Sequence, residues 1–325
     1  MRLAVVGAGR IVNFHLPALR AAGFELAAIA ARSNSSSARS IAKEFGIPKV
    51  FGTSQELISQ IQHFDAILIA SSSNSHLEYL SKLSNLTIPT LIEKPVFTNI
   101  DLNTTLTDSD LLAKHIMVGY NRRFYPSVKS FKRLIDQRQG GLLSICVPEL
   151  SGSEKPSAEE IYTCLRQNTV HIFDLLHFLF PLQTFSKNIF VHWNSDSTLA
   201  LVIVLQDKSF LIDVNITFGS PGNYNFEFRS GSQLATLKPL ERLDVFEGML
   251  IEDPTSEKPV RTYTPNPVST LESSATAFKP GFLEQAKHFF ELASKSPTSG
   301  HATLQDAFNI NLFVNDLIKK INDEL

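Results

Sequence analysis

The sequence predicts two domains of different class. The first is an N-terminal α/β domain with a doubly wound parallel sheet, and the second is a C-terminal α+β domain with an open, mainly antiparallel sheet and helices. Strand and helix patterns alternate up to about residue 118, which is typical of a parallel sheet. Beyond residue 188, consecutive strand patterns are separated by short polar turns, which favours antiparallel pairing. Because 325 residues exceed one ordinary domain, we place the domains at residues 1–120 and 121–325.

Short apolar runs bounded by turn residues identify the strands of the first domain, and segments with helical spacing identify its helices. Gly7 ends the first strand, and Gly46 with Pro48 ends the second helix. The expected strands are 3–6, 25–31, 50–51, 66–70, 90–92 and 116–118, and the expected helices are 11–22, 35–45, 54–62 and 75–84.

The second domain begins with two helices, at 127–137 and 158–180, and continues as a sheet. Its expected strands are 189–193, 198–205, 209–217, 223–229 and 233–237, followed by an extended loop at 252–276 and helices at 281–294 and 304–320. Apolar residues alternate with polar ones from Phe210 to Ile216, so helices or another subunit must cover one face of this sheet.

Composition excludes several classes of partner. The 30 basic and 32 acidic residues nearly balance, so there is no basic footprint for nucleic acid. The apolar stretches are too short to span a membrane and no signal-peptide pattern opens the sequence, so we expect a cytoplasmic protein. The two cysteines, Cys146 and Cys164, are expected to be reduced, and no His/Cys spacing suggests a metal site.

The turn after the first strand is the strongest functional signal. Gly7 can adopt the backbone angles of a tight turn, and Gly9 lets a diphosphate approach the main chain. Free N–H groups at the helix start, near Arg10 and Ile11, attract anionic oxygens. The turn therefore predicts a dinucleotide site, although Val12 replaces the third glycine of the G-x-G-x-x-G pattern.

The end of the second strand suggests which dinucleotide binds. An NAD site usually has an acidic side chain here, whereas this sequence has Ala31 followed by Arg32 and Ser33. A guanidinium can pair with a 2′-phosphate, so we expect NADP(H) to be preferred, with NAD(H) as the alternative.

Three further segments point to one family. They are Glu93-Lys94-Pro95 at a strand end, GYNRRFYP at 119–126 and QNTVHIFDLL at 167–176. With GAGRIVNFH at the start and the Asn74–His76 loop, the sequence resembles the Gfo/Idh/MocA oxidoreductases. The resemblance implies an N-terminal Rossmann domain that binds the dinucleotide and a C-terminal domain for substrate binding and oligomerisation. It also implies assembly as a homodimer or homotetramer, and hydride transfer between NAD(P) and a sugar, cyclitol or sugar-nucleotide carbon.

The chemistry of the residues agrees with this role. Lys94 follows a strand at the carboxyl edge of the parallel sheet, where it can stabilise charge on a reacting oxygen. His171 can exchange a proton near neutral pH. By resemblance, Lys94 and His171 match the catalytic lysine and the general acid/base. His15, in the first helix, either caps the cofactor pocket or only packs.

Two larger sets of residues complete the predicted site. The expected substrate contacts are Gln167, Asn168, Asp174, Tyr120 and Arg123. The expected cofactor contacts are Gly7, Gly9, Arg10, Ile11, Arg32, Ser33, Ser71, Asn74, His76, Glu93 and Lys94. Many family members have aspartate where this chain has Gln167, and an amide cannot hold a negative charge to tune His171 or Lys94.

The sequence therefore predicts an NAD(P)-dependent dehydrogenase or reductase acting on CH–OH groups. The alternative is a non-catalytic dinucleotide-binding protein of the same fold, because the acid is missing at Gln167. A third interpretation is a transhydrogenating enzyme that never releases its nucleotide.

Overall fold

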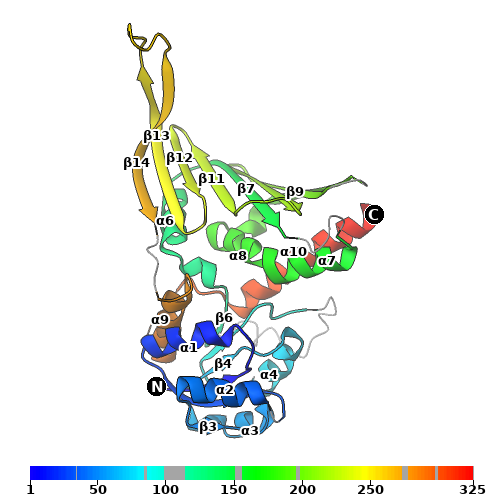
Figure 1. The fold of residues 1–325 in the computed structure, drawn as a ribbon. Coiled ribbons are helices and arrows are strands. Elements are labelled where there is room, and N and C mark those ends of the chain that lie inside the picture. The colour runs from blue at the N-terminus through cyan, green and yellow to red at the C-terminus, as the bar shows by residue number, and fades with distance from the viewer. Residues whose placement is uncertain are drawn as a thin grey trace. The chain divides into compact units, whose positions relative to one another are not determined.

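The computed structural model describes residues 1–33, 35–83, 86–98, 114–150, 156–194, 198–272, 277–296 and 299–324. The chain divides into two compact units, drawn in Figure 1. The first unit comprises 1–124, 173–178 and 276–316, and the second comprises 125–172, 179–275 and 317–325. The first unit thus takes up late segments that the sequence analysis grouped with the second domain.

The first unit is built on a six-stranded parallel sheet in the order β3-β2-β1-β4-β5-β6. Its strands are β1 (Arg2–Val6), β2 (Glu25–Ala30), β3 (Lys49–Val50), β4 (Ala66–Ile69), β5 (Thr90–Ile92) and β6 (Ile116–Val118). The strands on the two sides of β1 are added in opposite directions, which confirms the doubly wound Rossmann sheet predicted from the sequence.

Helices cover this sheet with their apolar sides. They are α1 (Val12–Ala21), α2 (Ser36–Phe45), α3 (Ser54–Ser59), α4 (His76–Leu83), α9 (Phe282–Ala293) and the first part of α10 (Leu304–Glu324). The Ser35 hydroxyl caps α2 and Gly46, at φ 62°, ends it. The α9 helix packs on the region of α1 through Phe289, whose ring lies 5.3 Å from that of Phe24.

The second unit contains an eight-stranded sheet in the order β14-β13-β12-β11-β7-β10-β9-β8. Its strands are β7 (Gly141–Glu149), β8 (Ser186–Asn194), β9 (Thr198–Gln206), β10 (Phe210–Phe218), β11 (Asn225–Ser230), β12 (Gln233–Leu237), β13 (Arg242–Glu252) and β14 (Thr262–Glu272). All neighbouring strands are antiparallel except β7 and β10, so the prediction of a mainly antiparallel sheet is confirmed.

Three strands of this sheet were not expected. The β7 and β13 strands were not predicted, and β14 lies within the segment that was expected to be an extended loop. Strand β12 pairs with β13 only up to Glu247, so the remainder of β13 and its partner β14 form a ribbon that projects beyond the sheet (Figure 1).

The apolar face of β10 lies in the core of the second unit. Ile212, Val214 and Ile216 are fully buried, and Phe131 of α6 (Pro126–Asp136) packs against Phe226 and Phe228 of β11. This face is therefore covered within the chain and does not itself require another subunit.

The predicted helix at 158–180 is two helices separated by one turn of π-helix. They are α7 (Ala158–Cys164) and α8 (Val170–Leu179), and the π-helical turn is Leu165–Thr169. A π-helical turn carries an extra residue and is frequent at functional sites. Among the described residues, we find no helix with the length and hydropathy needed to cross a bilayer.

Candidate active site

The turn between β1 and α1 requires glycine at position 7. Gly7 has φ 119°, and its N–H donates to the carbonyl of Ala30 at 2.8 Å. A Cβ at this position would lie 2.2 Å from the carbonyl oxygen of Ala70, at the end of β4. Only glycine permits both the backbone angle and the close approach of the two strand ends.

Space beside the same turn remains open at Gly9. A Cβ there would have no protein atom within 4 Å. Ile11 occupies the N-cap position of α1 and supplies no capping side chain, while the exposed Arg10 precedes it. A helix start without a side-chain cap beside open space fits the diphosphate of a dinucleotide. Val12, in place of the third glycine, is fully buried.

Arg32 and Ser33 follow β2 and are both exposed. The carbonyl of Ala31, at the strand end, accepts a hydrogen bond from the Ser54 hydroxyl at 3.3 Å. The guanidinium predicted to select the cofactor therefore lies at the carboxyl edge of the parallel sheet and faces solvent.

His76 connects the ends of β4 and β5. Its Nδ1 lies 2.9 Å from the Pro95 carbonyl, its Nε2 lies 3.1 Å from the Ser71 carbonyl, and the ring is 1% exposed. Burial lowers the pKa of His76, although the two carbonyls and the Glu93 charge act in the opposite direction. Asn74 is exposed in a short 3-10 turn before α4. The His76 ring thus links the backbone after β4, at Ser71, to the backbone after β5, at Pro95.

Glu93 joins Lys94 to the first helix. The Glu93 carboxylate accepts from His15 Nε2 at 2.6 Å and from the Lys94 backbone N–H at 3.2 Å. Both side chains of the His15–Glu93 pair are buried, and Phe282 packs edge-on against the imidazole. His15 thus packs and also bonds Glu93, and Lys94 itself is half-buried at the end of β5.

Three of the predicted substrate contacts are buried in the protein interior: Tyr120, Arg123 and Asp174. The Arg123 guanidinium donates twice to Asp174, from Nε at 2.8 Å and 2.9 Å, and its Nη1 lies 3.3 Å from Asp306. Asp174 is fully buried and Tyr120 is 1% exposed. Burial raises the pKa of Asp174 to about 7, opposed by Arg123, and raises that of Tyr120 well above its usual value. This environment favours a structural role over direct contact with a substrate.

Exposed polar residues line the π-helical turn in the second unit. Gln167 and Asn168 are exposed on it, and His171, one turn further, is 8% exposed. The amide of Asn168 donates to Glu149 at 2.6 Å and to the Tyr224 hydroxyl at 2.7 Å. His171 belongs to the second unit and Lys94 to the first, so their pairing stays a prediction.

Glu149, Thr169 and Tyr224 were missed by the sequence analysis. One signal was available, because Leu143, Ile145, Val147 and Glu149 alternate and share the buried face of β7. A carboxylate on such a face requires hydrogen-bond donors from another element.

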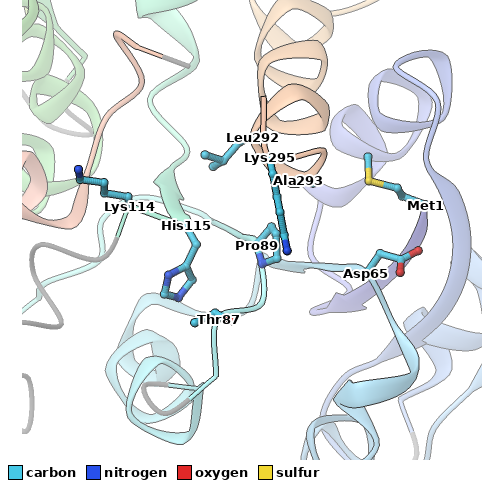
Figure 2. Close-up of a pocket in the computed structure, with 9 residues that line it drawn as sticks. All are labelled: Met1, Asp65, Thr87, Pro89, Lys114, His115, Leu292, Ala293 and Lys295. Atoms are coloured by element: carbon cyan, nitrogen blue, oxygen red, sulfur yellow. The ribbon is translucent and has the colours of Figure 1, made fainter. Parts of the chain in front are cut away.

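A separate pocket lies at the opposite edge of the parallel sheet. Its volume is about 700 Å³, and Figure 2 shows the residues that line it. Met1, Asp65, Pro89 and His115 stand at or before the starts of β1, β4, β5 and β6. None of the predicted site residues is among those lining the pocket. Among the described residues, no group of His, Cys, Asp and Glu could hold a metal ion.

Comparison with known proteins gives a family match for the N-terminal part of the chain. Residues 1–119 match the Gfo/Idh/MocA group, described as an oxidoreductase family with an NAD-binding Rossmann fold. This part of the chain therefore resembles that family, in agreement with the sequence motifs.

Curated relatives extend the similarity beyond this region. An inositol 2-dehydrogenase of Corynebacterium glutamicum is 27% identical over 258 residues, covering 74% of this chain and 72% of the relative. The rhizopine catabolism protein MocA of Rhizobium meliloti is 31% identical over 143 residues, covering 44% of this chain and 43% of the relative.

Solved structures share the fold of the whole chain. A dehydrogenase (MviM) from Clostridium difficile matches with a TM-score of 0.72 and 19% identity, covering 100% of this chain and 99% of the other. An oxidoreductase from Agrobacterium radiobacter, solved with NAD+, L-tartaric acid and magnesium, matches with a TM-score of 0.67 and 16% identity, covering 98% and 94%. At these identities the likeness concerns the fold alone.

Proposed function

We propose that the chain is an NAD(P)-dependent oxidoreductase that transfers a hydride between the nicotinamide and a CH–OH or carbonyl carbon of a sugar, cyclitol or sugar nucleotide. One observation carries the proposal. Gly7, Arg32, Ser71 and Lys94 each follow a different strand of one parallel sheet. They therefore share the carboxyl edge, where such sheets bind their ligands.

The residues at this edge fit a dinucleotide. The open space at Gly9 and the start of α1 would receive the diphosphate, with Arg10 and Ile11 beside it. Ser71, Asn74 and His76 would define the nicotinamide side. The exposed Arg32 and Ser33 support a preference for NADP(H), because a guanidinium pairs with a 2′-phosphate.

The proposed chemistry assigns one task to each polar group. A nicotinamide nucleotide held at this edge would supply the hydride chemistry. The Lys94 ammonium hydrogen-bonds the substrate oxygen and stabilises the negative charge that develops on it. His171 Nε2 or Nδ1 exchanges the hydroxyl proton, and Gln167 and Asn168 orient neighbouring hydroxyls. The pairing of Lys94 with His171 is part of the proposal.

The similarity to inositol dehydrogenases supports a polyol as substrate. The direct test combines fluorescence titration with NADPH and NADH and an assay of nucleotide reduction on inositols, aldoses and sugar nucleotides. We expect tighter binding of NADPH and turnover of at least one compound. Binding without turnover would favour the non-catalytic alternative, and nucleotide that survives purification and is reduced in place would favour a transhydrogenating enzyme.

We also propose that the chain forms a homodimer or homotetramer. The β13–β14 ribbon is apolar on both faces, because Met249, Leu250 and Ile251 are consecutive and each is about half exposed, as is Tyr263 opposite Ile251. An isolated two-stranded ribbon is marginally stable in water, so cover from a second copy is favourable.

A further inference from the structure

A buried carboxylate lies against the π-helical turn that carries Gln167. Glu149 is the last residue of β7 and is 1% exposed. Its Oε1 accepts from the Thr169 hydroxyl at 2.6 Å, and its Oε2 accepts from the Asn168 amide at 2.6 Å. A carboxylate removed from water is tolerated only with such donors, so these contacts tie the strand end to the turn.

The same contacts fix the orientation of Asn168. Its Nδ2 carries two hydrogens, and the group donates to Glu149 and to the Tyr224 hydroxyl, 2.7 Å away. The Asn168 side chain is therefore held from two sides while the residue remains exposed. A substrate hydroxyl would meet an amide that is already oriented, which lowers the entropy lost on binding.

The negative charge of Glu149 also reaches the neighbouring helix. Cys164, the last residue of α7, has a thiol pKa raised by burial first and then by the charges of Glu149 and Glu160. Cys164 immediately precedes the π-helical turn, so the Glu149 charge that raises the Cys164 pKa acts at the first residues of that turn.

We propose that Glu149 is the acidic positioning residue of the candidate active site, and that it supplies from a neighbouring strand the carboxylate that the helix lacks at Gln167. This inference rests on the proposed function. It implies that the site has a negative charge, from Glu149, even though position 167 carries a neutral amide.

A double-mutant cycle tests the inference on any substrate that the wild type turns over. Glu149→Gln should lower kcat/KM by about tenfold or more, because the group that accepts from Asn168 and Thr169 loses its charge and one of its two acceptor oxygens. Gln167→Asp is measured in both backgrounds: with Glu149→Gln it should restore most of the loss, and its gain in kcat/KM there should exceed its effect in the wild-type background. The matched control is Glu159→Gln, an exposed carboxylate in the first turn of α7, which should keep wild-type turnover.

Two results would overturn the inference. One is wild-type kcat/KM in Glu149→Gln, and the other is a loss that Gln167→Asp does not restore, which would indicate packing alone. If Glu149→Gln does not fold, Thr169→Val removes one donor and leaves the charge. It should then lower kcat/KM by about threefold or more, and wild-type turnover in that variant would contradict the inference.

A second readout does not depend on turnover. In a Cys146→Ser background, Cys164 is the sole cysteine of the chain, and its reaction with a thiol reagent against pH gives its pKa. Glu149→Gln should lower that pKa, and an unchanged value would show that Glu149 does not carry the proposed charge. A protein that shows this shift but turns over no polyol would count against the proposed function and not against the charge at Glu149.

Discussion

Replacing Gly7 by alanine should disturb both the fold and the cofactor site. The new Cβ would lie 2.2 Å from the Ala70 oxygen, 2.4 Å from its carbonyl carbon and 2.7 Å from the Ser71 nitrogen. All three are backbone atoms of the β4 end, so relief requires the strand ends to separate. A side chain at φ 119° is strained in addition.

Backbone strain and steric overlap together determine how much stability Gly7→Ala should lose. Backbone strain of this kind costs about 1–3 kcal/mol, and overpacking adds about 1–3 kcal/mol. For a chain of this length the melting temperature should fall by at least about 4 °C. Because the turn that faces the diphosphate would move, NADPH affinity should fall by about tenfold or more.

Gly9→Ala is the matched control, since its Cβ meets no protein atom within 4 Å. Its melting temperature should stay within about 1 °C of the wild type. Its NADPH affinity should still fall by about tenfold, because the methyl group would occupy the space assigned to the diphosphate. Differential scanning fluorimetry and fluorescence titration give both values. Wild-type melting of Gly7→Ala, or wild-type affinity of Gly9→Ala, would refute the reasoning.

Three further predictions concern the cofactor, the first helix and assembly. We expect the wild type to bind NADPH about tenfold or more tightly than NADH, and Arg32→Ala should remove most of this preference. Equal affinities for NADPH and NADH in the wild type would contradict this prediction. His15→Leu leaves the buried Glu93 carboxylate without its imidazole donor, so unfolding should become easier by about 1–3 kcal/mol. In chemical denaturation, His15→Gln should recover part of that loss; equal values for the two variants would mean that the hydrogen bond is unimportant. Light scattering at micromolar concentration should give a dimer or tetramer, and a mass of 36.1 kDa alone would exclude both.

The parallel sheet could be predicted because its strands are short apolar runs between glycine-rich or polar turns. The expected strands at 66–70, 90–92 and 116–118 end within one residue of those in the structure. The second sheet was harder. Pro148 and Gly141 lie within β7 and broke its strand pattern, and both faces of the outer ribbon are exposed, so it shows no alternation of buried residues.

The candidate site, like the fold, could be predicted only in part. Gly7 and Lys94 could be predicted as site residues because each comes within two residues of the end of a predicted strand. His15 and Glu93 are 78 positions apart in the sequence, and Arg123 and Asp174 are 51 apart. No local sequence pattern could therefore predict either pair. Glu149 and the π-helical turn likewise depend on tertiary contacts, since Asn168 and Thr169 bond a residue from another element.

The central claim is that Lys94 and His171 carry out proton and charge chemistry beside a bound nicotinamide nucleotide. The most direct measurement is turnover and NADPH affinity of Lys94→Ala, His171→Ala and the double variant on a substrate of the wild type. We expect Lys94→Ala to have almost no turnover, His171→Ala to lose about 10²–10⁴-fold in kcat, and all three to bind NADPH within a few-fold of the wild type. Turnover that survives in the double variant would contradict the account.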